Sequence, residues 1–365
     1  MLTPAAAGKL VGLGIDVRVE SGIGASLYIA DEAFEAAGAT VVSDAEAAIA
    51  EADVVVRLNP PPPYFVRSMR SGSLLVSFLD PFLKPELVKA LAETGVDSLC
   101  MELIPRTTYA QKMDALSSQA SLAGYAAVVL AADRIDQALP MMSTPAGTIV
   151  PTRVFVVGVG VAGLQAIATA KRLGARVSAY DTRPVVEEQV KSLGARFVKI
   201  DVGDSGQTEQ GYARELTAEQ LDRQRQQMLQ FCAESDILIT TAQVFGRPAP
   251  KIISADMVAA MRPGSVVVDL AASSGGNVEG TVAGQETVVN GVRIVGLNSF
   301  PSLVARDASQ MYASNVYNLI EHAFDSETGS LKLDDPEDDV VSSALLTRGG
   351  QVRHEGVRET VEASQ

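Results

Sequence analysis

A short glycine-rich segment carries the strongest chemical signal in the sequence. An apolar, β-branched run leads into Gly158-x-Gly160-x-x-Gly163, and a helical stretch at residues 164–173 follows. In such a strand–turn–helix, the first glycine permits a tight turn, the second lets the backbone approach a pyrophosphate, and the third lets helix and strand pack closely. The N–H groups at the helix start favour an anion. The spacing predicts a dinucleotide-binding unit, and it leaves open a βαβ unit that holds no ligand.

An acidic residue stands where the sugar of such a nucleotide would lie. Asp181 ends the next expected strand, about 20 positions after the glycines, where a carboxylate can accept hydrogen bonds from ribose hydroxyls. Because a carboxylate there repels the 2′-phosphate of NADP(H), we expect NAD(H). Arg183 could accommodate that phosphate, or it could equally be a surface arginine at a helix start, so the preference is not absolute.

Composition limits the other chemistry that the chain can support. The 365 residues include two histidines, His322 and His354, and two cysteines, Cys100 and Cys232. Most of the sequence therefore lacks the commonest general acid–base group, and the cysteines can form neither a disulfide framework nor a thiolate metal cage. We expect no metal site. The formal net charge of −14 repels phosphate backbones and argues against a nucleic-acid ligand.

The elements that must position these residues alternate along the whole chain. Short apolar strands separated by helix-length segments are typical of βαβ units and a parallel sheet. We predict an α/β protein with two Rossmann-like, doubly wound parallel-sheet domains joined by long helices. The strands are expected at residues 15–19, 39–42, 53–58, 73–78 and 96–103, and then at 153–158, 176–181, 195–200, 235–241, 265–270 and 292–296.

Two long helical stretches divide the chain. One, at residues 113–139, separates the two series of strands and ends in a proline- and glycine-containing segment at 140–147 that we expect to be a linker. The other, at 307–324, is expected to cross back to the first domain. No apolar run approaches 18 residues and the start lacks a secretion signal, so we expect a cytoplasmic chain without a membrane span. The domains are expected at residues 1–125 plus 303–365 and at residues 126–302.

A second spacing, Arg-x4-Gln-x2-Asp, precedes the first long helix at Arg106, Gln111 and Asp114 and continues into Ser117. With it and the glycine turn, nearly the whole chain resembles the NAD(H)-binding component of proton-translocating nicotinamide nucleotide transhydrogenase, known as domain I or the alpha-1 subunit. In that family the spacing is called the RQD loop, and it is much more specific than the glycine motif.

The resemblance implies half of an active site. Domain I of such enzymes binds NAD(H), domain III on a partner binds NADP(H), and hydride passes directly between the two nicotinamides. A membrane domain II couples this transfer to proton movement. The implied activity is that of a Si-specific, proton-translocating NAD(P)⁺ transhydrogenase that needs its partner subunits, as a homodimer held at the inner face of the membrane. Arg106, Gln111, Asp114 and Ser117 would hold the nicotinamide end, and Gln111 would reach the partner's NADP(H) ribose.

The same resemblance implies further contacts with NAD(H). Residues 201–212 look like the family's mobile loop, in which Gly211 and Tyr212 close over the nucleotide, although the composition alone suits an ordinary surface loop. The implied nucleotide-binding set is Gly158, Val159, Gly160, Val161, Gly163, Asp181, Thr182, Arg183, Gly211, Tyr212, Gln224, Ala242 and Gln243.

Four features depart from the family pattern. Tyr109 lies in the RQD loop where arginine is common, Phe245 replaces a more usual proline, and Ser273 stands where an acidic residue is frequent. The start of the chain lacks the strand and the Lys-Glu-rich turn that precede this point in relatives. We expect a misassigned start codon rather than a first domain that lacks its first strand. These departures affect fine contacts rather than nucleotide binding.

Two other functions stay open as alternatives. Alanine dehydrogenase shares the two-domain fold and the glycine fingerprint, but it needs a first-domain histidine for proton exchange and a lysine for the substrate carboxylate. Asp80 and Arg57 stand at about those positions here. The other alternative is a non-catalytic NAD(H)-binding module, which the intact RQD set argues against and Tyr109 mildly favours.

Overall fold

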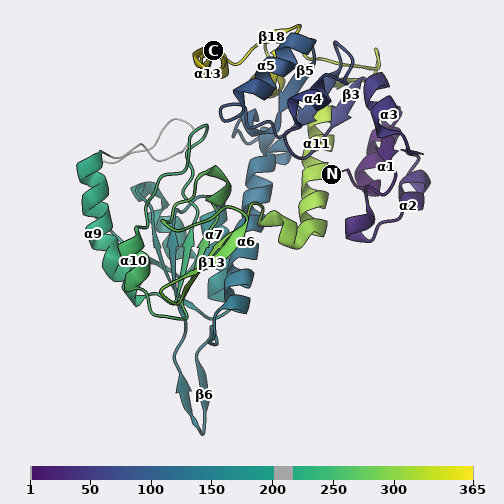
Figure 1. The fold of residues 1–365 in the computed structure, drawn as a ribbon. Coiled ribbons are helices and arrows are strands. Elements are labelled where there is room, and N and C mark those ends of the chain that lie inside the picture. The colour runs from purple at the N-terminus through teal and green to yellow at the C-terminus, as the bar shows by residue number, and fades with distance from the viewer. Residues whose placement is uncertain (1, 201–216, 365) are drawn as a thin grey trace. The chain divides into compact units, whose positions relative to one another are not determined.

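Two units, each with its own sheet and core, make up the chain. The computed structural model describes residues 2–200 and 217–364 (Figure 1). Unit 1 comprises Met1–Gln119 and Ala305–Gln365, and unit 2 comprises Ala120–Val304. One core cluster fills unit 1, and two clusters fill unit 2. The long helix α6 (Ala115–Arg134) begins in unit 1 and continues into unit 2.

The sheet of unit 2 has seven described strands in the order β10-β9-β8-β11-β12-β14-β13. All run parallel except β13, which pairs antiparallel with β14. Numbered along the chain, the parallel strands take the order 3-2-1-4-5-6, in which the strand order reverses between β8 and β11. The strands are β8 (Arg153–Val157), β9 (Arg176–Tyr180), β10 (Arg196–Phe197), β11 (Ile237–Thr240), β12 (Val266–Asp269), β13 (Gln285–Val289) and β14 (Val292–Gly296).

Both faces of this sheet are covered. Val154 and Val156 belong to a core cluster with α6, α7 and α8, whereas Phe155 and Val157 belong to a second cluster with α9 and α10. Burial on both faces explains why these strands are continuous apolar runs rather than alternating patterns. The helices of unit 2 are α7 (Val161–Arg172), α8 (Glu187–Ser192), α9 (Ala218–Glu234) and α10 (Ala255–Ala260), with short 3-10 turns at Pro184–Val186, Ala272–Ser274 and Pro301–Val304.

Unit 1 is built on a five-stranded sheet in the order β18-β17-β5-β4-β3. Strands β3, β4 and β5 are parallel, and β17 and β18 extend the sheet antiparallel from β5. The first two expected strands instead pair with each other in a separate two-stranded sheet. The strands are β1 (Arg18–Glu20), β2 (Thr40–Val42), β3 (Val54–Val56), β4 (Leu74–Ser77), β5 (Asp97–Cys100), β15 (Phe324–Asp325), β16 (Ser330–Leu331), β17 (Leu345–Arg348) and β18 (Gln351–Val352).

Helices and 3-10 turns complete unit 1. Helix α11 (Ala305–Ala323) buries one face in the core of this unit, and α1 packs against it. The other helices are α1 (Pro4–Gly12), α2 (Asp31–Ala36), α3 (Ala45–Glu51), α4 (Pro63–Val66), α5 (Pro85–Thr94), α12 (Asp339–Ala344) and α13 (Glu355–Ala363), and the 3-10 turns are η1 (Ala25–Leu27), η2 (Met101–Leu103) and η3 (Ala110–Met113).

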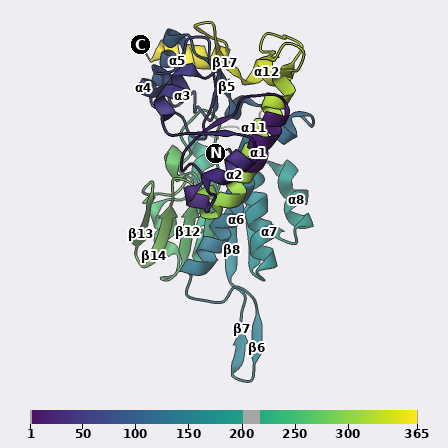
Figure 2. The same ribbon diagram turned by 90° about the vertical axis from the view of Figure 1, so that its right-hand side faces the viewer.

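The segment 140–147 is a hairpin, so the predicted linker is wrong. Strands β6 (Met142–Thr144) and β7 (Gly147–Ile149) pair antiparallel and project from unit 2 (Figure 2). Every residue of both strands is exposed. Proline and glycine mark hairpin turns as well as linkers, and the short polar strands carry no apolar alternation that would have distinguished the two.

Among the described helices, α6 is long and apolar enough to cross a membrane by length and composition. A buried core helix meets the same criteria. Within unit 2 this helix contributes Ala126, Ala127, Val128, Leu130 and Ala131 to the core. It also starts later and ends earlier than the predicted 113–139, because η3 precedes it and the chain turns after Arg134.

Candidate functional site

The glycine turn has the strand–turn–helix geometry that its sequence predicts. Gly158 follows β8 with φ of +94°, a conformation that disfavours any residue with a Cβ. A Cβ built at Gly163 would lie 2.0 Å from the carbonyl oxygen of Gly158, so only glycine lets α7 pack this closely. Gly160 is the N-cap of α7 and offers no side chain to the N–H groups of its first turn, which begins at Val161. These N–H groups can therefore bind an anion.

Asp181, directly after β9, is joined to this turn. Its Oδ2 accepts a 2.7 Å hydrogen bond from the Val159 N–H. Arg183 folds over the same carboxylate, with its backbone N and Nε at 2.8 and 2.9 Å from Oδ1 and Nη2 at 2.9 Å from Oδ2. Thr182 lies between the two. A carboxylate has about four acceptor positions, and here all four are in use.

The interpretation of Arg183 as a surface arginine is therefore wrong. Its side chain is 15% exposed, and its guanidinium also donates to the Val159 carbonyl at 3.2 Å. The hydrogen bond to Asp181 raises the pKa of Arg183, so the pair is fully charged at neutral pH. Because the guanidinium is already paired, a 2′-phosphate would have to compete with a buried carboxylate for it.

The segment after β11 completes the carboxyl edge of this sheet. Thr241 Oγ1 donates to the Gly158 carbonyl at 3.0 Å, and the backbone of Ala242 makes two hydrogen bonds with the buried Asn277 amide, at 3.0 and 2.7 Å. Gln243 follows and is exposed. Thus β8, β9 and β11 bring the glycine turn, Asp181 and Ala242 to the edge where the strand order reverses, which is where open α/β sheets bind ligands. Thr241 and Asn277 were missed because nothing in their local sequence marks them.

The residues of the RQD loop lie in unit 1. Asp114 is 8% exposed and accepts hydrogen bonds from the Ser117 N–H at 2.8 Å and the Ser117 hydroxyl at 2.5 Å. These bonds cap the start of α6, so Asp114 and Ser117 are held rigidly against each other. Arg106 and Gln111 have exposed side chains on the loop before them.

Helix α11 anchors this loop, which local sequence reasoning did not anticipate. The amides of Asn315 and Asn318 both donate to the Lys112 carbonyl at 2.9 Å, and the Ser118 hydroxyl donates to the Asn315 side chain at 2.8 Å. The loop is thus fixed by side chains about 200 positions away along the chain.

Comparison with known proteins decides the family. The N-terminal domain of alanine dehydrogenase/PNT matches residues 1–123, and the C-terminal domain of alanine dehydrogenase/PNT matches residues 127–355. The chain belongs to the alanine dehydrogenase/PNT family. The predicted family relationship and the predicted α/β fold class are confirmed.

Within this family the chain is more similar to transhydrogenase subunits than to alanine dehydrogenases. The first of the separate parts of NAD(P) transhydrogenase subunit alpha in Rhodospirillum rubrum is 44% identical over 97% of this chain and 94% of the relative. The crystal structure of a transhydrogenase from Sinorhizobium meliloti is 42% identical with a TM-score of 0.83, covering 97% of this chain and 95% of that one. Alanine dehydrogenase of Halomonas elongata is 29% identical over 98% of this chain and 92% of the relative.

Several residues implied by the family resemblance lie outside the described structure. Gly211 and Tyr212 fall among residues 201–216, and Gln224 lies in α9 with a side chain that is not described. Of the family departures, Tyr109 is 62% exposed in the loop before η3, and Ser273 is exposed in the 3-10 turn at Ala272–Ser274.

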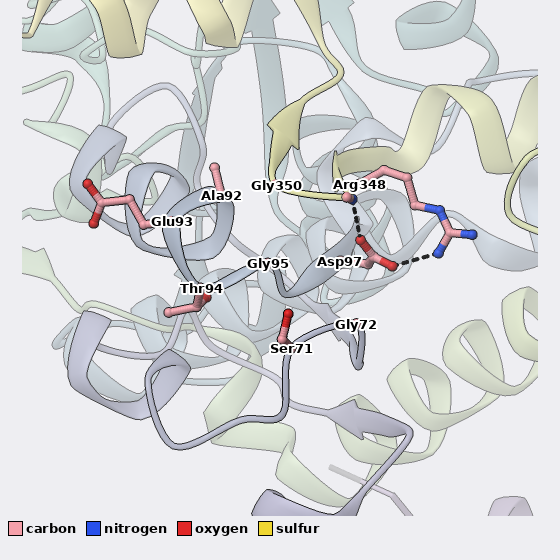
Figure 3. Close-up of a pocket in the computed structure, with 10 residues that line it drawn as sticks. Ser71, Gly72, Ala92, Glu93, Thr94, Gly95, Asp97, Arg348 and Gly350 are labelled. Atoms are coloured by element: carbon pink, nitrogen blue, oxygen red, sulfur yellow. Dashed lines mark hydrogen bonds and ion pairs between the residues drawn. The ribbon is translucent and has the colours of Figure 1, made fainter.

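Two hollows in the described structure lie away from these residues. One is in unit 1, where Arg348 and Asp97 point toward each other beside Ser71 and Glu93 (Figure 3). The other is in unit 2, at the amino ends of β8 and β9, opposite the glycine turn. Neither contains a residue of the predicted nucleotide site. Among the described residues, no group of three or more His, Cys, Asp or Glu side chains is placed to hold a metal ion.

Proposed function

We propose that this chain is the NAD(H)-binding subunit of a proton-translocating transhydrogenase. In this proposal hydride passes between NADH held here and NADP⁺ held by domain III of a partner, and a membrane domain II couples the transfer to proton movement. The observation that carries it is the carboxyl edge of β8, β9 and β11, where an uncapped helix start and Asp181 meet at the reversal of strand order. The 44% identity over nearly the full length of the Rhodospirillum rubrum alpha chain supports the same assignment.

The described residues fit a dinucleotide. A Cβ built at Gly160 meets no atom within 4 Å, so the backbone there is open to a bulky anion. The pyrophosphate would lie on the N–H groups of α7, the ribose against Asp181, and the adjacent chain of the nucleotide near Val159, Ala242 and Gln243. Gly211, Tyr212 and Gln224 are proposed to complete the site.

The nicotinamide end would be held by Arg106, Gln111, Asp114 and Ser117. A guanidinium, an amide and a carboxylate supply the donors and acceptors that a carboxamide and a ribose diol need. Bound NADH supplies the hydride itself. Direct transfer between two nicotinamides requires no general base, and it depends on holding the reacting carbons in register. This suits a chain with no histidine before His322.

A second copy of the chain is the proposed partner of the β6–β7 hairpin. Met142 and Ile149 are 45% and 46% exposed on it, and Met141 and Val150 at its base are 66% and 73% exposed. Apolar side chains on a projecting arm lose water contacts when a partner covers them. Together with the membrane domain II and domain III, this would give a homodimer held peripherally at the inner face of the membrane.

Mixing the protein with a recombinant domain III tests the proposal. Transfer of hydride from NADH to an NADP⁺ analogue, without any added amino acid, is the expected result. Stereospecifically deuterated NADPH in the reverse direction tests the proposed Si-specificity. No transfer at any ratio of the two proteins would refute the proposal.

Alanine dehydrogenase activity is the alternative, and the geometry of unit 1 gives it little support. Asp80, which stands about where that enzyme needs a histidine, has φ of +52° and a pKa raised by burial. Arg57 stacks on the Phe65 ring, with its guanidinium carbon 4.3 Å from the ring centre. NADH oxidation that required pyruvate and ammonia would favour this alternative, and NADH binding with neither activity would favour a non-catalytic module.

A further inference from the structure

Three polar side chains form a continuous chain across unit 1. The Tyr109 hydroxyl lies 3.1 Å from Nδ1 of His322, and the two rings meet edge to face with their centres 5.4 Å apart. On the other side of the imidazole, Nε2 lies 2.8 Å from Oδ2 of Asp338. One end of this chain is Tyr109, in the loop that carries Arg106 and Gln111, and the other end is the start of α12.

The two inner members of this chain are fixed by their own elements. Asp338 caps α12 by accepting hydrogen bonds from the N–H groups of Val340 and Val341 at 3.0 and 3.1 Å. His322 lies seven positions after Asn315 on α11, so both project from the same face of that helix. Their side chains are mostly buried, His322 at 16% and Asp338 at 18% exposure. The loop tyrosine is therefore bound to a rigid post.

The chemistry of the imidazole suits both contacts. A neutral ring with its proton on Nε2 directs that proton at the carboxylate and leaves Nδ1 to accept from the Tyr109 hydroxyl. Burial alone would raise the pKa of Asp338, but the hydrogen bond from His322 and those from the backbone bring it below its usual value. The carboxylate is thus charged at neutral pH. The other charged pair on this side of α11 is Lys112 with Glu321, whose charged atoms lie 3.9 Å apart.

We propose that Tyr109, His322 and Asp338 act as a positioning clasp that holds the loop from Arg106 to Asp114 in the conformation that receives the nicotinamide. The inference rests on the proposed function. Lys112 and the two asparagines of α11 fix the later part of the loop, whereas the clasp fixes its middle, between Arg106 and Gln111. The tyrosine that departs from the family pattern is therefore a positioning residue.

The kinetic test removes the contact without removing the ring. Tyr109→Phe keeps the edge-to-face packing and loses the hydroxyl, and Tyr64→Phe, at a 75% exposed tyrosine elsewhere in unit 1, is the matched control. A single hydrogen bond predicts a roughly five-fold fall in kcat for hydride transfer with domain III. The dissociation constant for NADH should change less than two-fold, because the proposed pyrophosphate and ribose contacts lie in unit 2. Tyr64→Phe should match the wild type in both.

A second pair of variants tests the imidazole itself. His322→Gln can still accept from Tyr109 and donate to Asp338, so it should retain most of the wild-type kcat. His322→Leu should show the same fall as Tyr109→Phe. Equal loss in both His322 variants, or no loss in either, would overturn the clasp.

Proton NMR gives a readout that does not depend on turnover. With two histidines in the chain, His354→Asn identifies the ring signals of both. Adding NADH should shift the His322 signal and leave that of His354 in place, and Tyr109→Phe should abolish the shift. An unshifted His322 signal together with wild-type kcat in Tyr109→Phe would overturn the clasp alone, whereas absence of transfer by the wild type would overturn the proposed function and the clasp with it.

Discussion

Replacing Gly160 with alanine separates nucleotide binding from folding. The backbone there has φ of −85° and ψ of −162°, which any L-residue can adopt, and a Cβ meets nothing within 4 Å. The protein should therefore accept the methyl group. The same methyl group would stand at the N-cap of α7, where the pyrophosphate is proposed to approach the backbone.

The expected magnitudes follow from this geometry. Losing a glycine makes the unfolded chain less flexible and stabilises the fold by about 0.4–1 kcal/mol. Alanine is a poorer N-cap than glycine by a similar amount, so the free energy of unfolding should change by less than about 0.5 kcal/mol. Hydrogen bonds to a charged phosphate contribute about 1.5–3 kcal/mol each, so losing one should weaken NADH binding by about 10- to 100-fold.

Two further alanines serve as controls for this experiment. Gly163→Ala places its Cβ 2.0 Å from a backbone oxygen and should cost about 1–3 kcal/mol of stability with or without NADH. Gly12→Ala, in α1 with open space around it, should change neither stability for the worse nor binding. Urea unfolding and fluorescence titration with NADH measure the two quantities. Wild-type affinity in Gly160→Ala would refute the placement of the pyrophosphate over this turn.

Three other predictions concern the described residues of unit 1 and the thiols. Arg348→Met should lower the free energy of unfolding by about 1–3 kcal/mol, because the 5% exposed Asp97 loses a guanidinium nitrogen 2.6 Å away; unchanged urea stability would contradict this. Burial raises the pKa of both Cys100 and Cys232, the latter to about 12, so iodoacetamide at pH 8 should label them only in denaturant, and mass spectrometry that finds a labelled native thiol would disprove it. Burial also raises the pKa of Glu102 above its ordinary value of 4.5, so the folded state binds more protons there and stability from this group falls as pH rises above that value. Glu102→Gln should flatten this fall in unfolding measurements from pH 4 to 7, and equal slopes would count against it.

What could be predicted from the sequence is what neighbouring residues determine. Gly158, Gly160 and Gly163 lie within six positions, and their roles depend on the turn that they themselves form, so the structure reproduces the predicted geometry. The buried strands of unit 2 were equally visible, because burial on both faces demands continuous apolar runs. Asp181 was found in the same way, from its position at the end of the next strand.

What could not be predicted depends on contacts between distant segments. Arg183 was ambiguous because its identity alone does not tell whether it folds over Asp181 or faces solvent. The pairing of Tyr109 with His322 joins residues 213 positions apart, which no local pattern encodes. The β6–β7 hairpin failed for another reason, since its strands are exposed on both faces and lack the alternation that identifies a strand.

The pairing of Asp181 and Arg183 has a consequence for how tightly the proposed subunit would hold its nucleotide. All four acceptor positions of the carboxylate are occupied, so a ribose hydroxyl can be accepted only if one charge-assisted bond from Arg183 opens. The new hydrogen bond replaces an existing one, and its net contribution to affinity is therefore small. A subunit that must release NAD⁺ after every transfer gains from this exchange, because strong ground-state binding would slow release without speeding the hydride step. Selectivity survives the exchange, since Asp181 stays charged and buried in either arrangement and still opposes a 2′-phosphate.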